Sequence, residues 1–200
     1  MSTSSKTKAG VMDQGSADIV LVTWNFPPKT GGMEKLLYDL YNGLSKTYTV
    51  NVIAPFGRSV ENVTGTVHRA PLPGFVCFAF YAFFKSIPLV AKRRAGAILG
   101  GSLVVSPILG LLRRILSARV AVYAHGLDVI YPCRLYQALL RRSVSQMDGI
   151  ICNSTNTLRM LEERFSIRGV TEVIPPGIHP EDFTESCERP VSERYLLSVG

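Results

Sequence analysis

The stretch PPKTGGMEKLLYDLYNGL, residues 27–44, decides the fold of this chain. It follows a short apolar run, Ile19 to Val22, and crosses two consecutive glycines, Gly31 and Gly32, before a segment with helical periodicity. A buried strand, a glycine turn and an amphipathic helix in this order begin an α/β fold of the nucleotide-binding kind. The backbone N–H groups at the start of such a helix face open space, so they can bind an anion.

The helix that follows the glycines is predicted to start near Met33 and to bury one apolar stripe that includes Leu37 and Tyr41. Glu34 falls in its first turn, where a carboxylate complements the positive end of the helix dipole. A contact between Glu34 and a ligand is the alternative interpretation, and the sequence favours neither.

Apolar runs and helical segments alternate along the rest of the chain. The runs are typical of parallel strands buried on both faces and cover 48–54, 97–100, 119–124, 149–152 and 171–174, with a short strand at 66–70. Helices are expected over 107–116, 135–146 and from Asn153–Ser154 onward. The sequence therefore predicts an α/β, Rossmann-like, doubly wound domain with a mainly parallel sheet and helices on both faces.

The domain boundaries follow from shifts in composition. Residues 1–17 are polar and small and indicate a disordered leader, residues 18–180 form the Rossmann-like domain, and the polar, proline-containing segment 181–194 indicates a linker. Residues 195–200 are an apolar strand with nothing behind it, so we expect the chain to break off at the first strand of a second domain.

Charge and cysteine content narrow the class of protein. The 200 residues carry a formal net charge of +7, which favours a polyanionic neighbour, although a generally basic solvated surface is an equal alternative. The four cysteines have no zinc-binding spacing, and reduced thiols in the cytoplasm are expected.

Residues 95–112 lack charge but contain glycines, serines and a proline, so a buried strand, turn and helix explains them better than a membrane span.

The segment 75–94 combines an aromatic cluster with a basic end. Phe83 and Phe84 stand near its middle, and Lys92, Arg93 and Arg94 close it. This pattern suits a helix that lies in a membrane interface, at the inner face of the cytoplasmic membrane. A packed helix with a solvated basic end is the competing interpretation, and aromatic stripes are more often core.

Five loops fall at the predicted carboxyl ends of strands, where open parallel sheets bind ligands. They contain Gly31–Gly32, Gly101–Ser102, His125 to Asp128, Asn153–Ser154 and Pro176–Gly177, and we expect them to converge on one crevice. His125 stands at a strand end beside a glycine, and this position favours a functional role over a merely structural one. The dinucleotide fingerprint, the P-loop, the hydrolase nucleophile elbow and an aromatic-basic nucleic-acid motif are all absent.

Several segments together resemble the family 4 retaining glycosyltransferases, whose amino-terminal domain is half of the two-domain GT-B fold. FPPKTGGMEKLLYDLYNGL resembles their opening glycine loop and first helix, and YAHGLDVI resembles their H-G-x-[DE] segment. Further matches are MDGIICNSTNTLRMLEERF, VIPPGIHPEDF and YLLSVG, the last of which resembles the first strand of the donor-binding domain.

The resemblance implies roles for individual residues. Gly31 and Gly32 would close over the donor diphosphate, His125 would lie near the transferred sugar, Asp128 is the matched acidic position, and Glu34 would touch the acceptor. The donor would be a nucleotide-sugar and the acceptor a glycan or a lipid-linked molecule, with no metal, no other cofactor and no nucleic acid.

One departure and one absence qualify this picture. His179 stands where the family usually has an aspartate, so a role for that carboxylate is not carried over. The family's E-x(7)-E element and its phosphate-binding basic residues belong to a second domain, so we expect the chain alone to lack most of the donor site and to be inactive. The alternatives are a non-catalytic membrane-surface or partner-binding module built on residues 75–94 and a generic α/β nucleotide-binding protein.

Overall fold

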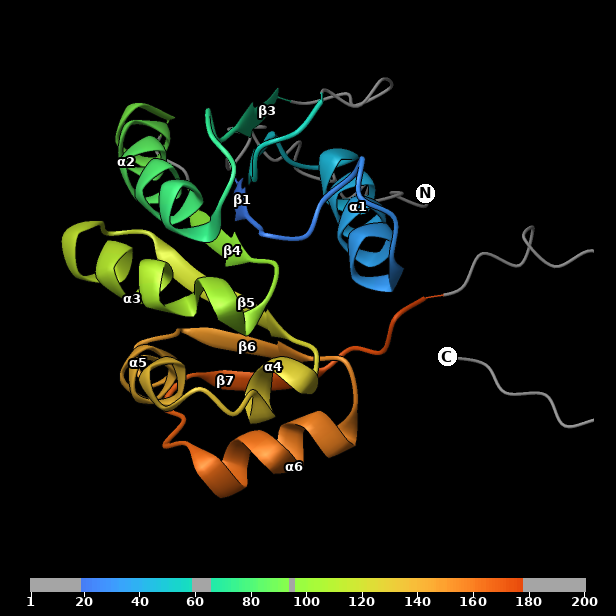
Figure 1. Cartoon of the computed structure of the whole chain (residues 1–200), viewed down its shortest axis with the longest axis vertical. Helices are drawn as coiled ribbons and strands as arrows, with labels where there is room; N and C mark the ends of the chain where they lie inside the picture. The colour runs from blue at the N-terminus through green and yellow to red at the C-terminus, as the bar shows by residue number, and fades with distance from the viewer. Residues whose placement is uncertain (1–18, 59–65, 94–95, 178–200) are drawn as a thin grey trace, which may run out of the picture.

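The computed structural model describes residues 19–58, 66–93 and 96–177, and for residues 92 and 93 it describes only the backbone. These segments form one sheet with helices packed on both faces (Figure 1). The expected leader, linker and final strand, together with His179 and Arg94, lie outside the described residues.

The strands and the longer helices follow one another in the order that the sequence predicts. The strands are β1 Ile19–Val22, β2 Val50–Ala54, β3 Thr66–Arg69, β4 Ala97–Gly100, β5 Arg119–Ala124, β6 Gly149–Cys152 and β7 Val170–Val173. The helices are α1 Gly32–Ser45, α2 Phe75–Arg93, η1 Leu103–Val105, α3 Ser106–Ile115, α4 Leu127–Ile130, α5 Arg134–Val144 and α6 Thr155–Arg164.

All seven strands are parallel and follow the order β3-β2-β1-β4-β5-β6-β7. Strands β2 and β3 extend the sheet in one direction from β1, and β4 to β7 extend it in the other. The order of the strands therefore reverses between β1 and β4, which is the topological switch point where doubly wound folds bind their ligands. The predicted Rossmann-like, doubly wound fold is confirmed.

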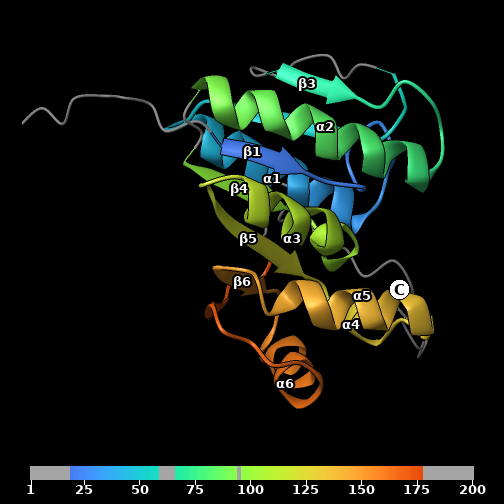
Figure 2. The same ribbon diagram turned by 90° about the vertical axis from the view of Figure 1, so that its left-hand side faces the viewer.

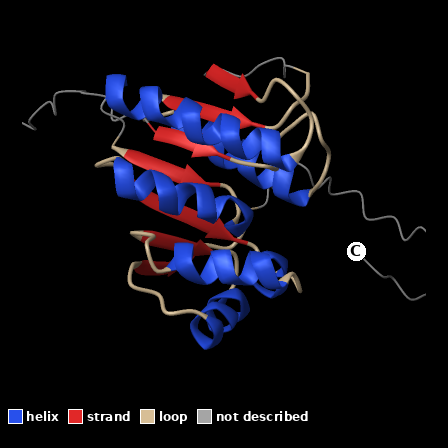
Figure 3. Ribbon diagram, turned by 60° about the vertical axis from the view of Figure 1, so that its left-hand side comes forward, coloured by secondary structure: helices blue, strands red, loops and turns tan. Residues whose placement is uncertain are grey.

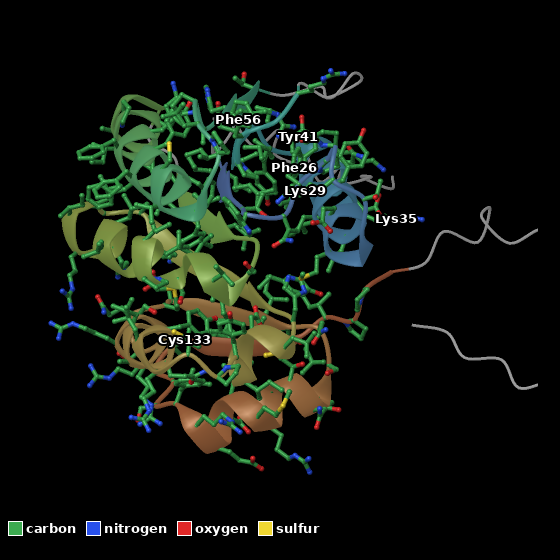
Figure 4. The ribbon with its side chains drawn as sticks, in the orientation of Figure 1. Phe26, Lys29, Lys35, Tyr41, Phe56 and Cys133 are labelled. Atoms are coloured by element: carbon green, nitrogen blue, oxygen red, sulfur yellow. The ribbon has the colours of Figure 1, made fainter. Side chains whose placement is uncertain are left out.

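Side chains of each central strand alternate between two cores. Val20 and Val22 of β1 pack in the larger core with residues of α2, α3, α5 and α6, whereas Leu21 packs in the smaller core with Leu37 and Tyr41 of α1. Phe26 joins this smaller core, with its ring edge-on to Tyr41 (Figure 4). Burial on both faces explains why these strands read as unbroken apolar runs.

The uncharged stretch 95–112 becomes β4, η1 and the first part of α3, as expected from its glycines and its proline. Gly100 lets α3 approach the sheet, because a Cβ at this position would lie 2.5 Å from Leu109 Cδ1. Within the described residues, no helix is both long and apolar enough to cross a membrane.

The short helix α4 was not predicted. It follows Gly126, whose φ of 90° lies in the region that favours glycine, and it ends after only four residues. A single turn is too short to show a helical period in the sequence. This turn nevertheless matters, because it carries Leu127 and Asp128 to the ligand-binding edge of the sheet.

Candidate active site

A cleft of about 420 Å³ opens at the carboxyl ends of the strands, at the switch point between β1 and β4. Each of the five predicted loops contributes at least one residue to it. The lining residues are Asn25, Gly32, Met33, Leu36, Ser102, Val104, His125, Leu127, Asp128, Asn153 and Pro176. The carboxyl ends of β1, β4, β5, β6 and β7 thus meet in one place, which is where the fold concentrates ligand contacts.

One wall of the cleft is the loop after β1 and the first turn of α1. Thr23 Oγ1 donates to the carbonyl oxygen of Asn25 over 2.8 Å and accepts from its N–H, which fixes the loop. Asn25 Nδ2 donates to Glu34 Oε1 over 2.9 Å. The N–H groups of Gly32 and Met33 begin α1 and have no partner one turn earlier in the helix, so they are available to an anion.

The backbone of Gly31 does not need a glycine, since its φ of 171° is extended. A Cβ at Gly31 would clash with Glu34 Oε2, so a larger residue would shift the Glu34 carboxylate. Neither Gly31 nor Glu34 lines the cleft, in contrast to Gly32. Glu34 is buried behind Asn25, and its predicted contact with the acceptor stays a prediction.

The opposite wall is organised by the carboxylate of Asp128. Its Oδ2 accepts from the N–H of Leu103 over 2.9 Å, and its Oδ1 accepts from the N–H of His125 over 3.0 Å. It therefore joins the loop after β4 to the loop after β5. Burial raises the pKa of Asp128 above its ordinary value, although these N–H bonds and the neighbouring imidazole of His125 work in the opposite direction.

His125 is held from three sides at the end of β5. Its Nε2 lies 2.7 Å from the carbonyl oxygen of Gly101, and its ring stacks on Tyr123 at a centroid distance of 4.9 Å. Asn153 Nδ2 donates to the carbonyl oxygen of His125 over 3.3 Å. Because a carbonyl can only accept, Nε2 carries a proton and donates it to Gly101.

Ser102 lies between these walls with its hydroxyl buried and without a hydrogen-bond partner among the described residues. A buried hydroxyl without a partner costs free energy.

We expect Ser102→Ala to leave the thermal unfolding midpoint unchanged or to raise it, as measured by circular dichroism. Ser106→Ala is the control, because it removes a 2.8 Å bond to Ser143 and should lower the midpoint. A clear loss of stability in Ser102→Ala alone would show that the hydroxyl has a partner.

The structure thus brings together Gly32, His125 and Asp128 of the predicted site residues. Sequence reasoning missed Asn25, which lines the cleft and holds Glu34. The available signal was its place as a polar residue just beyond an apolar strand. Asn153 and Ser154 begin α6 as predicted: Ser154 accepts the N–H of Thr157, and Asn153 Oδ1 accepts from the Thr157 hydroxyl over 2.6 Å. Asn153 also lines the cleft.

The predicted membrane-surface residues differ in their exposure. Phe83 is half-buried against the larger core, whereas Phe84 is exposed on the outer side of α2. The side chains of Lys92 and Arg93 and all of Arg94 are outside the described part of the chain.

No metal-binding group of three or more His, Cys, Asp or Glu side chains occurs among the described residues.

A parallel doubly wound sheet with a largely apolar cleft at its switch point, into which a few polar side chains converge, defines an α/β domain of the ligand-binding class. The family model described as Glycosyltransferase Family 4 matches residues 30–182. The chain belongs to this family, and the predicted resemblance is confirmed. Among the curated proteins compared with it, none matches the sequence.

Solved structures with the GT-B glycosyltransferase fold share this architecture. Sucrose-phosphate synthase from Thermosynechococcus elongatus is 16% identical with a TM-score of 0.70, over 83% of this chain and 49% of that protein. Anabaena HepE in complex with UDP-glucose is 17% identical with a TM-score of 0.57, over 80% of this chain and 44% of that protein. MurG from Acinetobacter baumannii is 12% identical with a TM-score of 0.52, over 86% and 47%. The chain therefore spans less than half the length of these three proteins.

Proposed function

We propose that the chain is the acceptor-side, amino-terminal half of a glycosyltransferase that moves a sugar from a nucleotide-sugar donor to a glycan or lipid-linked acceptor, with retention of configuration. The observation that carries this proposal is the meeting of the α1 amino terminus, His125 and Asn153 in one cleft, in a chain of glycosyltransferase family 4. The UDP-glucose bound by the structurally similar HepE supports a nucleotide-sugar donor.

The groups that line the cleft suit a nucleotide-sugar donor and a sugar or apolar acceptor. The free N–H groups of Gly32 and Met33 suit the diphosphate of the donor, because they and the helix dipole attract negative charge without a metal ion. The apolar side chains of Met33, Leu36 and Leu127 suit the flat face of a sugar or an apolar acceptor. Among the described residues, no lysine or arginine lines the cleft.

We therefore expect the remaining charge of the donor to be neutralised by a second domain. The 200-residue chain should bind nucleotide-sugars weakly, with a dissociation constant of about 1 mM or above, and should transfer no sugar. Isothermal titration with UDP-glucose and other nucleotide-sugars measures the first expectation. Micromolar affinity of the chain alone would overturn the proposal that two domains share the donor site.

Transfer itself is tested with a chimera in which the donor-binding domain of a family 4 enzyme follows residue 194. Release of nucleoside diphosphate in the presence of an acceptor mixture is the expected result, and analysis of the product's anomeric configuration reports retention. A folded chimera that binds the donor but releases no nucleotide with any acceptor class would contradict the proposal, as would sugar transfer by the chain without a second domain.

A further inference from the structure

Helices α2, α3 and α5 lie side by side in one layer over the sheet, with α3 in the middle (Figures 2 and 3). Their sheet-facing residues supply most of the larger core. Their outward-facing residues are not the polar set that covers most helices of this kind. We call this outward surface of α2, α3 and α5 the three-helix face.

Among the described side chains of α2, every exposed one is apolar. These side chains are Phe75, Val76, Phe80, Phe84, Pro88 and Ala91, and those of Phe80 and Phe84 are each 64% exposed. Large exposed apolar side chains continue on the two neighbouring helices, at Leu111, Ile115, Leu135 and Leu139. An apolar area spread over three adjacent helices exceeds the scattered single residues that need no explanation.

The charge of the three-helix face has one sign. The sequences of α2, α3 and α5 contain no aspartate or glutamate. Their basic residues are Lys85, Lys92, Arg93, Arg113, Arg114, Arg134, Arg141 and Arg142. By contrast, α1 carries Glu34 and Asp39, and α6 carries Glu162 and Glu163.

Part of this positive charge is neutralised inside the protein, and part is not. Arg113 forms an ion pair with Asp148 at 2.9 Å, whereas Arg114 donates to the uncharged amide of Gln146 and keeps its net charge. Arg134, Arg141 and Arg142 are exposed, and their guanidinium groups make no ion pair or hydrogen bond to any residue in the described part of the chain. Unpaired guanidinium groups beside exposed leucines are suited to phosphate on one side and hydrocarbon on the other.

We propose that the three-helix face binds the surface of an anionic phospholipid bilayer. Phe80, Phe84, Leu135 and Leu139 enter the interface between headgroups and acyl chains, and the arginines of α5 contact headgroup phosphates. The positive charge of the three-helix face favours an anionic lipid surface over an apolar protein partner. An uncharged apolar partner would gain nothing from the arginines of the face, which also lacks any aspartate or glutamate in its three helices. The contact is peripheral and uses helices that also carry the core of the domain.

The three-helix face also borders the candidate active site. Ile130 and Tyr131, at the end of α4, line a groove of about 520 Å³ together with Arg134 and Arg141 of α5. Leu127, one turn earlier in α4, lines the cleft. If the proposed function holds, an acceptor held in the bilayer would lie one helical turn from the cleft. The lipid binding itself does not depend on that function.

The test is co-sedimentation of the 200-residue chain with vesicles of phosphatidylcholine alone and of phosphatidylcholine with phosphatidylglycerol. We expect binding to the anionic vesicles only, and we expect it to weaken as salt is added. The double variant Arg141→Glu with Arg142→Glu should weaken binding by about thirtyfold or more, and Phe80→Ser with Phe84→Ser by more than about tenfold. All four side chains are exposed, so the fold should persist, which circular dichroism checks.

The matched controls lie elsewhere on the protein. Lys35→Glu with Lys46→Glu makes the same change of charge at α1, which covers the opposite face of the sheet (Figure 4 labels Lys35). Phe56→Ser matches the loss of an exposed phenylalanine in the loop after β2. Equal loss in these controls, equal binding to neutral vesicles or no binding at all would overturn the proposal. So would vesicle-independent dimers that the Phe80/Phe84 variant abolishes, because the face would then be a contact between copies.

Discussion

Replacing Asp128 by alanine is expected to lower the free energy of unfolding by about 3 kcal/mol. The carboxylate accepts the N–H of Leu103 and the N–H of His125, and both donors would lose their partner. Each buried donor left unpaired costs about 1–3 kcal/mol, and the loop after β4 would separate from the loop after β5. Asp128→Asn should cost about half as much, because an amide oxygen can replace only one of the two acceptor atoms.

Urea denaturation followed by circular dichroism measures both variants. Glu163→Gln is the control for the exchange of a carboxylate for an amide, since its ion pair with Arg159 is exposed and should contribute less than about 0.5 kcal/mol. If Asp128→Ala were as stable as this control, the carboxylate would not hold the two loops together.

The same carboxylate predicts a dependence on pH. Burial holds the pKa of Asp128 in the folded protein above its ordinary value of 3.8, so the folded state binds a proton more readily than the unfolded state does. The stability that this proton provides is present below pH 3.8 and is lost as the pH rises through the folded pKa. Asp128→Asn has no such group, so its deficit relative to the natural chain should be larger at about pH 4 than at about pH 7.

The cleft could be predicted from the sequence because its position depends only on where the strands end. Apolar runs locate β1, β4, β5 and β6, and the carboxyl ends of parallel strands must share one edge. The glycine turn and His125 could therefore be assigned to a common crevice before any contact was known. The prediction that Gly31 binds an anion stays a prediction, and the structure adds that its missing side chain leaves room for the Glu34 carboxylate.

Other features depend on contacts that no local pattern contains. The bond between Asp128 and the N–H of Leu103 joins residues 25 positions apart, and the bond between Asn25 and Glu34 depends on the path of the loop after β1. The three-helix face is a further case, because the aromatic pattern of α2 was visible but its neighbours α3 and α5 are set by the order of the strands. Side-chain direction in loops and the pairing of distant helices are tertiary properties.

Replacing His125 by alanine is expected to reduce the turnover number of the family 4 chimera by about 10²–10³-fold while the domain stays folded. This magnitude is typical for the loss of one preorganised polar group at a reacting centre. The ring is fixed by Gly101 and Tyr123, so it needs no reordering when substrates arrive. With Nε2 committed to the carbonyl oxygen of Gly101, Nδ1 is the ring nitrogen that is left to form a hydrogen bond with a sugar hydroxyl.

A purely structural role of His125 would give a different result. Loss of its bond to Gly101 should cost only about 1 kcal/mol of stability. Tyr123→Phe removes a bond of similar kind, from the phenol to the carbonyl oxygen of Ile174 over 2.6 Å, and Tyr123 does not line the cleft. We expect the two variants to lose similar stability, but only His125→Ala to lose turnover, with the Michaelis constant of the donor changing by less than about threefold. Equal turnover in both variants would remove His125 from the reaction and leave it as a support for the loop after β4.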